Sequence, residues 1–174
     1  MGNIIKDVVG KTNPISKKEV DEFKLLVSEA IFLTENQNSL DFSNNFPPEI
    51  AGALGALGAG TIGVGVVFTA FAGMSGAEIM SALAGFGIAG AVGGIASIAA
   101  LVAAPVVLVG GGAFHLANQN KLGRELWKLV KKSYEVERKL QDDERDIVKG
   151  LVKTIQEYRD KLKSKHYDLR KINS

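Results

Sequence analysis

The pattern of apolar and polar positions divides the chain into three stretches. Residues 16–34 place apolar side chains at helical spacing, which predicts an amphipathic helix. Residues 51–117 are almost continuously apolar, and residues 118–170 return to a helical stripe with polar residues between its members. We therefore expect an all-α protein with three regions: an N-terminal amphipathic helix and linker at 1–50, a glycine-rich apolar block at 51–117 and a charged helical region at 118–174.

The N-terminal helix has a clear start. Ser16 and Glu19 have the spacing of a capping box just before the apolar run. Such a helix either packs on the rest of the protein or lies in a membrane interface, and its mixed-sign polar face with few lysines favours packing. The polar residues 35–48 then predict a linker, because Pro47-Pro48 stops a preceding helix and suits the first turn of the next.

The apolar block predicts a helical hairpin or three helices, of which the middle one is short for a span and is compatible with a re-entrant or interfacial position. Residues 51–73 are uncharged and long enough to cross a hydrocarbon core of about 30 Å. A turn is expected at residues 73–76, followed by helices at about 77–92 and 95–117. The break between these two falls at Gly93-Gly94, and Pro105 predicts a kink in the last helix.

Small residues recur at every fourth position of this block. Glycine disfavours helices in water, whereas in lipid small side chains let helix backbones approach closely. We therefore expect helix-packing faces at Ala51, Gly55, Ala59, Gly63, Ala77, Ser81, Gly85, Ala89, Gly93 and Ser97. Two Gly-x-Gly-x-x-Gly matches in the block lack the preceding strand that dinucleotide binding requires, so no cofactor is expected.

The C-terminal region has coiled-coil-like spacing. Leucines and other apolar residues step by four and three from Leu122 to Leu140 and resume from Ile147 to Leu169, with a stutter near Gly150. The acidic run at 141–144 either interrupts one long helix or divides two. The stripe is equally compatible with a self-packed helical hairpin and with an intermolecular coiled coil.

Charge is distributed unevenly along the 174 residues. Glu78 is the only charged residue between Glu49 and Lys121, and 16 of the 20 glycines lie between Gly52 and Gly112. A water-soluble domain needs a wet face on each helix, so this stretch indicates a lipid environment. Residues 1–50 carry five basic and eight acidic residues, whereas residues 121–174 carry sixteen and ten. The positive-inside rule then predicts a membrane protein with a cytoplasmic C-terminal region.

Three single residues are candidates for special roles. Glu78 is either an intramembrane acid, which would be costly and functional, or the exposed acid of a turn. His115 and Trp127 are expected at the membrane interface, although Trp127 also suits the coiled-coil seam. The chain has two distant histidines and no cysteine, so neither a metal site nor a catalytic constellation is expected.

The apolar block resembles a known family. The stretch from Phe68 through Gly76-Ala77-Glu78-Ile79-Met80 and on to Ser97 resembles the glycine- and alanine-rich core of the interferon-inducible 6-16/27-like small membrane proteins. This resemblance implies a hydrophobic helical protein linked to organelle membranes and cell death. The order of an apolar hairpin and long amphipathic helices also looks like that of α-helical pore-forming toxins and colicin-type proteins.

Our leading functional prediction is a non-enzymatic protein that self-associates through its small-residue faces and forms a pore or disrupts a membrane. Its expected partners are the lipid bilayer, further copies of the chain and a helical protein on the C-terminal helices, but no nucleic acid, because acids are interleaved with the bases. Two alternatives remain: a membrane-anchored coiled-coil adaptor, and a soluble helical oligomer that buries the block between subunits.

Overall fold

The computed structural model of the chain describes residues 13–86 and 111–172, with only the backbone of 111–118 and Tyr167. These residues form helices and no strand, which confirms the all-α class. The helices are α2 (Lys17–Glu35), α3 (Pro48–Gly58), α4 (Val64–Gly73), α5 (Gly76–Gly85), α7 (Gly111–Leu140), α8 (Asp146–Lys165) and the short 3-10 helix η1 (Tyr167–Lys171).

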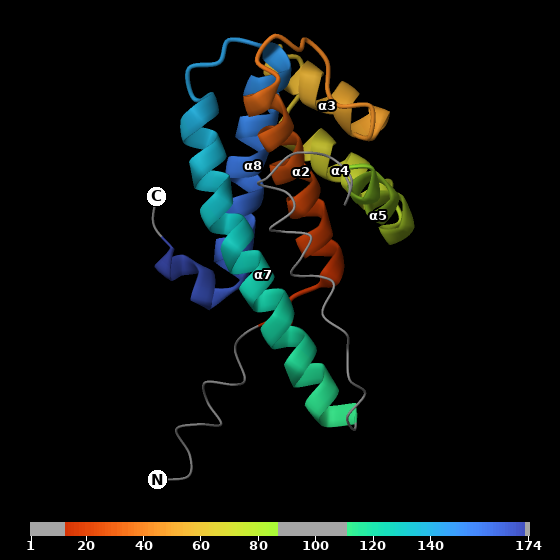
Figure 1. Cartoon of the computed structure of the whole chain (residues 1–174), viewed down its shortest axis with the longest axis vertical. Coiled ribbons are helices and arrows are strands. Elements are labelled where there is room, and N and C mark those ends of the chain that lie inside the picture. The colour runs from red at the N-terminus through yellow and green to blue at the C-terminus, as the bar shows by residue number, and fades with distance from the viewer. Residues whose placement is uncertain (1–12, 87–110, 173–174) are drawn as a thin grey trace.

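Helix α2 is the centre of the fold. It runs beside α7 and α8 along the long axis of the molecule, with α3, α4 and α5 gathered on one flank (Figure 1). The predicted capping box is present, because Ser16 and Glu19 each satisfy a backbone N–H of the other. Packing of this helix on the rest of the protein is confirmed, and nearly every side chain from Val20 to Ile31 is buried.

Several polar residues of α2 are buried as well, and among them only the Ser28 hydroxyl has no hydrogen-bond partner in the described part of the chain. Lys24 forms an ion pair with Glu125 of α7, with 2.9 Å between Nζ and Oε1. Glu29 accepts hydrogen bonds of 2.7 Å from both the backbone N–H and the hydroxyl of Ser43 in the linker. These contacts satisfy charges that burial alone would make costly, which is why an amphipathic sequence can occupy a central position.

The acidic run divides two helices. Residues 141–145 connect α7 to α8, which returns alongside α2 and α7 as a self-packed hairpin (Figure 1). The predicted stripe is buried within the single chain, with Leu126, Leu151 and Ile155 at most 1% exposed. Arg159 joins the two helices through an ion pair of 2.6 Å with Glu137 and through stacking on the Tyr134 ring at 3.7 Å. Within this chain the stripe therefore packs as the self-packed hairpin alternative predicts.

The predicted single helix at 51–73 is wrong. Two helices, α3 and α4, occupy this range, separated by a turn at 59–63. Gly60 has φ of +76°, and the amides of Gly60 and Thr61 donate to Leu57 and Ala56 respectively. This is a Schellman motif, in which a glycine in the left-handed region ends a helix and satisfies its last carbonyls.

The other boundaries in the block agree only in part with the prediction. The linker and the Pro47-Pro48 start of α3 are confirmed, as is the turn between Gly73 and Gly76. Helix α7 is described from Gly111 to Leu140, so one helix runs through position 117, where the prediction placed the change from the apolar block to the charged region. The Gly93-Gly94 break and Pro105 lie outside the described residues.

Candidate functional site

Helices α4 and α5 form a bent apolar hairpin that we call the α4–α5 hairpin. The sequence ends α4 at Gly73 and restarts at Ser75, which caps α5 by accepting from the N–H of Glu78 at 3.2 Å. Among the described helices, none is both long and apolar enough to cross a bilayer alone. Together α4 and α5 have sufficient length and hydropathy, but they are bent by 102°.

Three buried side chains dock this hairpin on the bundle. Val67 and Phe71 of α4 and Ile79 of α5 are at most 2% exposed. Phe71 lies edge-on to the ring of Tyr158 in α8, with 6.4 Å between ring centroids, while α5 packs on α2. Further apolar residues of both helices, among them Phe68 and Leu83, are partly buried against the same core, so docking uses one side of the hairpin rather than its whole surface.

Two lysines of α2 fasten the turn of the hairpin. Lys18 Nζ donates to the carbonyl oxygen of Met74 at 3.0 Å, and Lys17 Nζ lies 3.3 Å from the sulfur of Met80. Both lysines also pair with acids of their own helix, Lys17 with Asp21 and Lys18 with Glu22. These exposed polar contacts are weak, so they orient the hairpin without fixing it.

The part of the hairpin that is not buried against the bundle carries exposed apolar side chains. Val66 is 50% exposed and Met80 is 40% exposed. The small residues Ala77 and Ser81 are also exposed. An apolar surface of this kind on a helix pair is a feature of sites that meet another protein or a membrane.

Glu78 is placed at the start of α5. Its carboxylate accepts from the backbone N–H of Ser75 at 2.6 Å, and the side chain is exposed. The acid thus completes a capping box, as a turn residue does, and its charge is favoured at the helix N-terminus.

The predicted small-residue faces point mostly away from the bundle. In α3 and the following turn, a Cβ at Gly55 or Gly63 would meet no atom within 4 Å, and Ala51 is half-buried while Ala59 is exposed. Gly85 contacts the linker, since its carbonyl accepts from Asn45 at 2.9 Å. The remaining predicted positions, Ala89, Gly93 and Ser97, lie outside the described residues.

The glycine contact that the fold does use was not predicted. Gly58 of α3 and Gly150 of α8 lie where these helices cross, and a Cβ on either would overlap the backbone of the other helix. One signal was available in the sequence: Gly150 interrupts an otherwise well-patterned polar helix, where glycine has a cost that close packing can offset.

A cavity of about 280 Å³ lies beneath the hairpin, between α2, α4 and α8. Phe68 and Phe71 line one side, and the rest of the lining includes both basic and acidic side chains, those of Lys18, Lys161, Lys165, Glu19 and Glu22. Tyr158 in its wall donates a hydrogen bond to Glu22, and burial together with this bond raises the pKa of the phenol well above its ordinary range. The phenol therefore remains a neutral donor that joins α8 to α2 below the hairpin.

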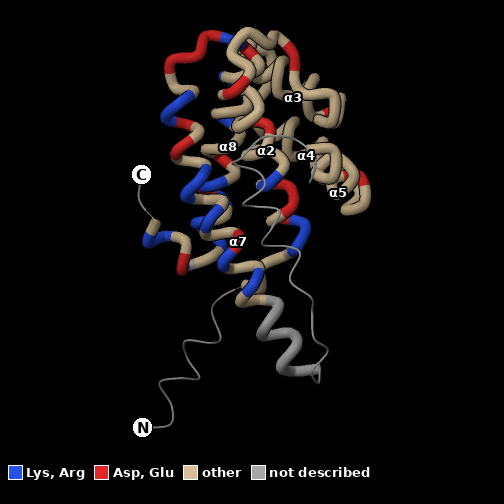
Figure 2. Tube along the Cα trace, in the orientation of Figure 1, with Lys and Arg blue, Asp and Glu red and all other residues tan. Residues whose placement is uncertain are grey.

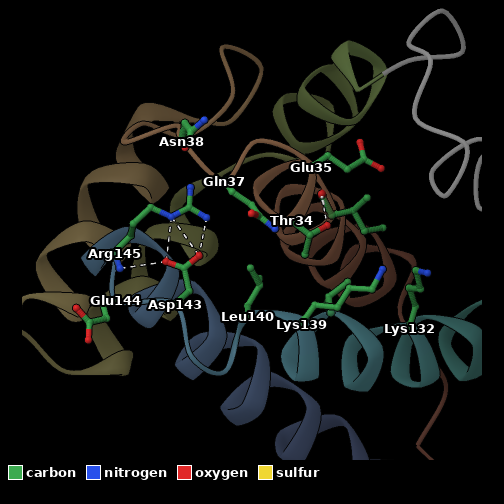
Figure 3. A pocket seen from close by; sticks show the side chains of 12 residues that line it. Thr34, Glu35, Gln37, Asn38, Lys132, Lys139, Leu140, Asp143, Glu144 and Arg145 are labelled. Atoms are coloured by element: carbon green, nitrogen blue, oxygen red, sulfur yellow. Dashed lines mark hydrogen bonds and ion pairs between the residues drawn. The ribbon is translucent and has the colours of Figure 1, made fainter.

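A second, open groove of about 880 Å³ lies at the far end of α2 (Figure 3). Lys132 and Lys139 of α7 and Glu35 of α2 stand on its walls, and Asp143 and Arg145 close one end. Arg145 is bound to Asp143 at 2.7 Å and donates to the carbonyl of Ser39 at 2.6 Å. These partners make that end of the groove a structural junction between the linker and the α7–α8 connection.

The other predicted residues are widely separated. Trp127 lies on the outer face of α7, 40% exposed, with Lys131 Nζ 4.0 Å from its ring centroid. It is therefore absent from the helix seam. The backbone of His115 is in the first turns of α7, and its side chain is outside the description. Within residues 13–86 and 119–172, His, Asp and Glu form no cluster that could hold a metal ion.

Comparison of the chain with protein-family models, curated proteins and solved structures yields no match.

Proposed function

We propose that this protein acts on a membrane, with the α4–α5 hairpin leaving the helical bundle to insert into lipid. The observation that carries the proposal is the incomplete burial of the hairpin: only three of its side chains are fully buried and others are partly buried, while Val66 and Met80 remain 50% and 40% exposed. Glu78 is the only charged residue in either helix, and the sequence stays uncharged from Ile79 to Asn120. The apolar region available for insertion is thus longer than the hairpin.

The energetics of docking support a reversible contact. Burying Val67, Phe71 and Ile79 contributes roughly 5–9 kcal/mol in total, at about 1.5–3 kcal/mol for each side chain. A bilayer core would bury the same three residues and also the exposed apolar side chains, so lipid competes well with the bundle for this hairpin. The contact of α3 with α8 is more extensive, so we expect α3 to stay on the bundle when the hairpin leaves it.

Self-association belongs to the same proposal. Ala77 and Ser81 form a smooth outward strip on α5, and a Cβ at Gly55 or Gly63 would meet open space. In lipid, such small-residue faces let helices approach closely and associate. We propose that inserted hairpins assemble through these faces into a pore or lesion, as toxins and cell-death or defence effectors do.

The adaptor alternative has less support. A coiled-coil adaptor needs a free apolar seam, and the C-terminal stripe is buried against α2 and within the α7–α8 hairpin. A soluble oligomer remains a distinct outcome of the test below, because a second copy would also cover Val66 and Met80.

The test is release of a self-quenched dye from vesicles of phosphatidylcholine and phosphatidylglycerol. Val66→Glu combined with Met80→Glu places two charges on exposed positions, so the fold is kept while insertion is penalised; we expect dye release to fall at least tenfold. Leu40→Glu, at a linker residue that is 76% exposed, is the matched control. Equal release by both variants contradicts the proposal, and so does a wild-type protein that forms stable oligomers in buffer and releases no dye.

The assembly step is tested by Ser81→Leu. This exposed residue has room for a larger side chain, and leucine is compatible with both helix and lipid. We expect the variant to bind vesicles normally and to lose dye release and cross-linked oligomers. Unchanged oligomers in this variant would show that the strip on α5 is not the assembly face.

A further inference from the structure

We propose that the outer face of α7 formed by Arg124, Trp127, Lys128 and Lys131, which we call the α7 basic face, docks on an anionic lipid surface. This inference rests on the proposed function only in that the protein meets a membrane. The inference goes beyond the proposed function because it names a second surface of the protein and the lipid charge that this surface recognises.

The geometry fixes this face on the outside of the bundle. Leu122, Leu126 and Leu129 on the opposite side of α7 are buried where the helix packs on α2. The spacing of 124, 127, 128 and 131 places the four outer side chains on adjacent turns of one surface. All four are exposed, and the Lys131 ammonium lies 4.0 Å from the centre of the Trp127 ring.

The charge of the face is not cancelled along the helix. Between residues 119 and 134 the only acid is Glu125, which is buried and paired with Lys24 of α2. The next acid, Glu135, pairs with Lys132 at 2.7 Å. Figure 2 shows several basic segments along α7 and a cluster of acids at the α7–α8 connection, with further acids on other helices. The α7 basic face therefore presents three positive charges around an aromatic ring.

This combination fits a bilayer surface better than the other polyanion, nucleic acid. Tryptophan is favoured at the headgroup level, where its ring is half in the apolar phase, and cations nearby are attracted to anionic lipid. The face also follows the uncharged sequence that ends at Asn120, so it would meet the headgroups that flank an inserted segment. Acids elsewhere on the chain, including the run at 142–144, disfavour a continuous nucleic-acid track.

Trp127 is the only tryptophan in the chain, so its emission reports directly on this face. We would titrate the full-length protein with phosphatidylcholine vesicles that contain or lack phosphatidylglycerol, and record Trp127 emission, flotation and dye release from the same samples. The expected result is a blue shift and flotation with phosphatidylglycerol only, both suppressed by high salt. A variant with Arg124→Gln, Lys128→Gln and Lys131→Gln should bind on the order of a hundredfold more weakly.

The matched control removes three exposed lysines elsewhere, by Lys149→Gln, Lys153→Gln and Lys171→Gln, and should bind as the wild type does. Equal binding by the two triple variants overturns the inference, as does flotation without a shift of Trp127 emission or tighter binding to duplex DNA than to anionic vesicles. Binding with a blue shift but no dye release would support this inference and contradict the proposed insertion. Dye release without any preference for anionic lipid would support the proposed insertion and contradict this inference.

Discussion

Gly58 and Gly150 face each other at the crossing of α3 and α8, where neither helix has room for a side chain. A Cβ on Gly58 would lie 1.7 Å from the carbonyl oxygen of Asp146, and one on Gly150 would lie 1.9 Å from that of Leu54. The close approach allows Leu54 and Leu151 to be fully buried beside it. It fixes α3, and hence the start of the α4–α5 hairpin, to the bundle.

Replacing either glycine at this crossing should separate the two helices. We expect Gly150→Ala and Gly58→Ala each to lower the free energy of unfolding by about 1–3 kcal/mol or more, because the obstruction is backbone. Gly55→Ala in the same helix is the control and should be neutral or stabilising by about 0.5–1 kcal/mol, since its Cβ meets open space. Urea denaturation measures both, and equal stability of Gly58→Ala and Gly55→Ala would contradict the contact.

The buried ion pair between Lys24 and Glu125 gives a second prediction. Lys24→Met should destabilise the fold by about 3–5 kcal/mol, because it leaves the Glu125 carboxylate buried without its counter-charge. The double variant with Lys24→Met and Glu125→Met should recover most of the loss. A double-mutant cycle of unfolding free energies decides the matter; losses that simply add would show that the two groups are not coupled.

Glu29 and Asp143 should affect the pH dependence of stability in opposite directions. Burial raises the pKa of Glu29, against the hydrogen bonds from Ser43, so its stabilising contribution is present below its unfolded pKa and is lost as pH rises through the folded value. The hydrogen bond from Arg145 lowers the pKa of Asp143, so its contribution is present above the unfolded pKa and is lost as pH falls through the folded value.

Unfolding free energies of Glu29→Gln and Asp143→Asn between pH 3 and pH 7 test this difference. Relative to the wild type, Glu29→Gln should gain stability as the pH rises, and Asp143→Asn should lose it. Parallel pH profiles for the two variants would show that the environments of these carboxylates are not as described.

Arg145 should be sensitive to a change that keeps its charge. Its guanidinium donates to the carbonyls of Leu33, Asn36 and Ser39, which ties the end of α2 and the linker to the α7–α8 connection. Lysine cannot present this fork of donors, so Arg145→Lys should cost about 1.5–3 kcal/mol of stability. Arg138→Lys, at an exposed position of α7, should change stability by less than about 0.5 kcal/mol. Equal losses of stability in Arg145→Lys and Arg138→Lys would show that the hydrogen bonds of the Arg145 guanidinium to these carbonyls do not stabilise the fold.

The sequence predicts the parts of this fold that depend on local signals. The capping box at Ser16, the prolines at 47 and 48 and the turn at 73–76 act through neighbouring residues, and each boundary agrees with the structure. The Schellman turn at Gly60 was also local, but one glycine among many in the block gave no distinct signal. The mixed-sign polar face with few lysines correctly favoured packing of α2 on the protein over a position in a membrane interface.

The contacts between distant residues could not be predicted. Ser43 donates hydrogen bonds to Glu29, and Tyr158 donates one to Glu22. No sequence spacing links the two residues of either pair. The docking of Phe71 and Ile79 on the bundle could not be predicted either. The same apolar residue types face lipid in a membrane helix and fill the core of a folded protein. Only the structure distinguishes the apolar side chains of the α4–α5 hairpin that are buried against the bundle from those that are exposed.

The central claim, that the α4–α5 hairpin must leave the bundle to act, is tested most directly by locking it. The chain contains no cysteine, so Lys17→Cys with Met80→Cys creates a single reactive pair between α2 and α5. The Nζ atom of Lys17 and the sulfur of Met80 lie 3.3 Å apart. A short bismaleimide with a reducible spacer joins the pair. The control joins Lys132→Cys to Glu135→Cys within α7, where no movement is expected.

Dye release from phosphatidylglycerol-containing vesicles is then recorded before and after reduction of the spacer. We predict that the locked hairpin releases no dye, that reduction restores release, and that the α7 control releases dye in both states. Release at the full rate while the hairpin is locked would contradict the claim.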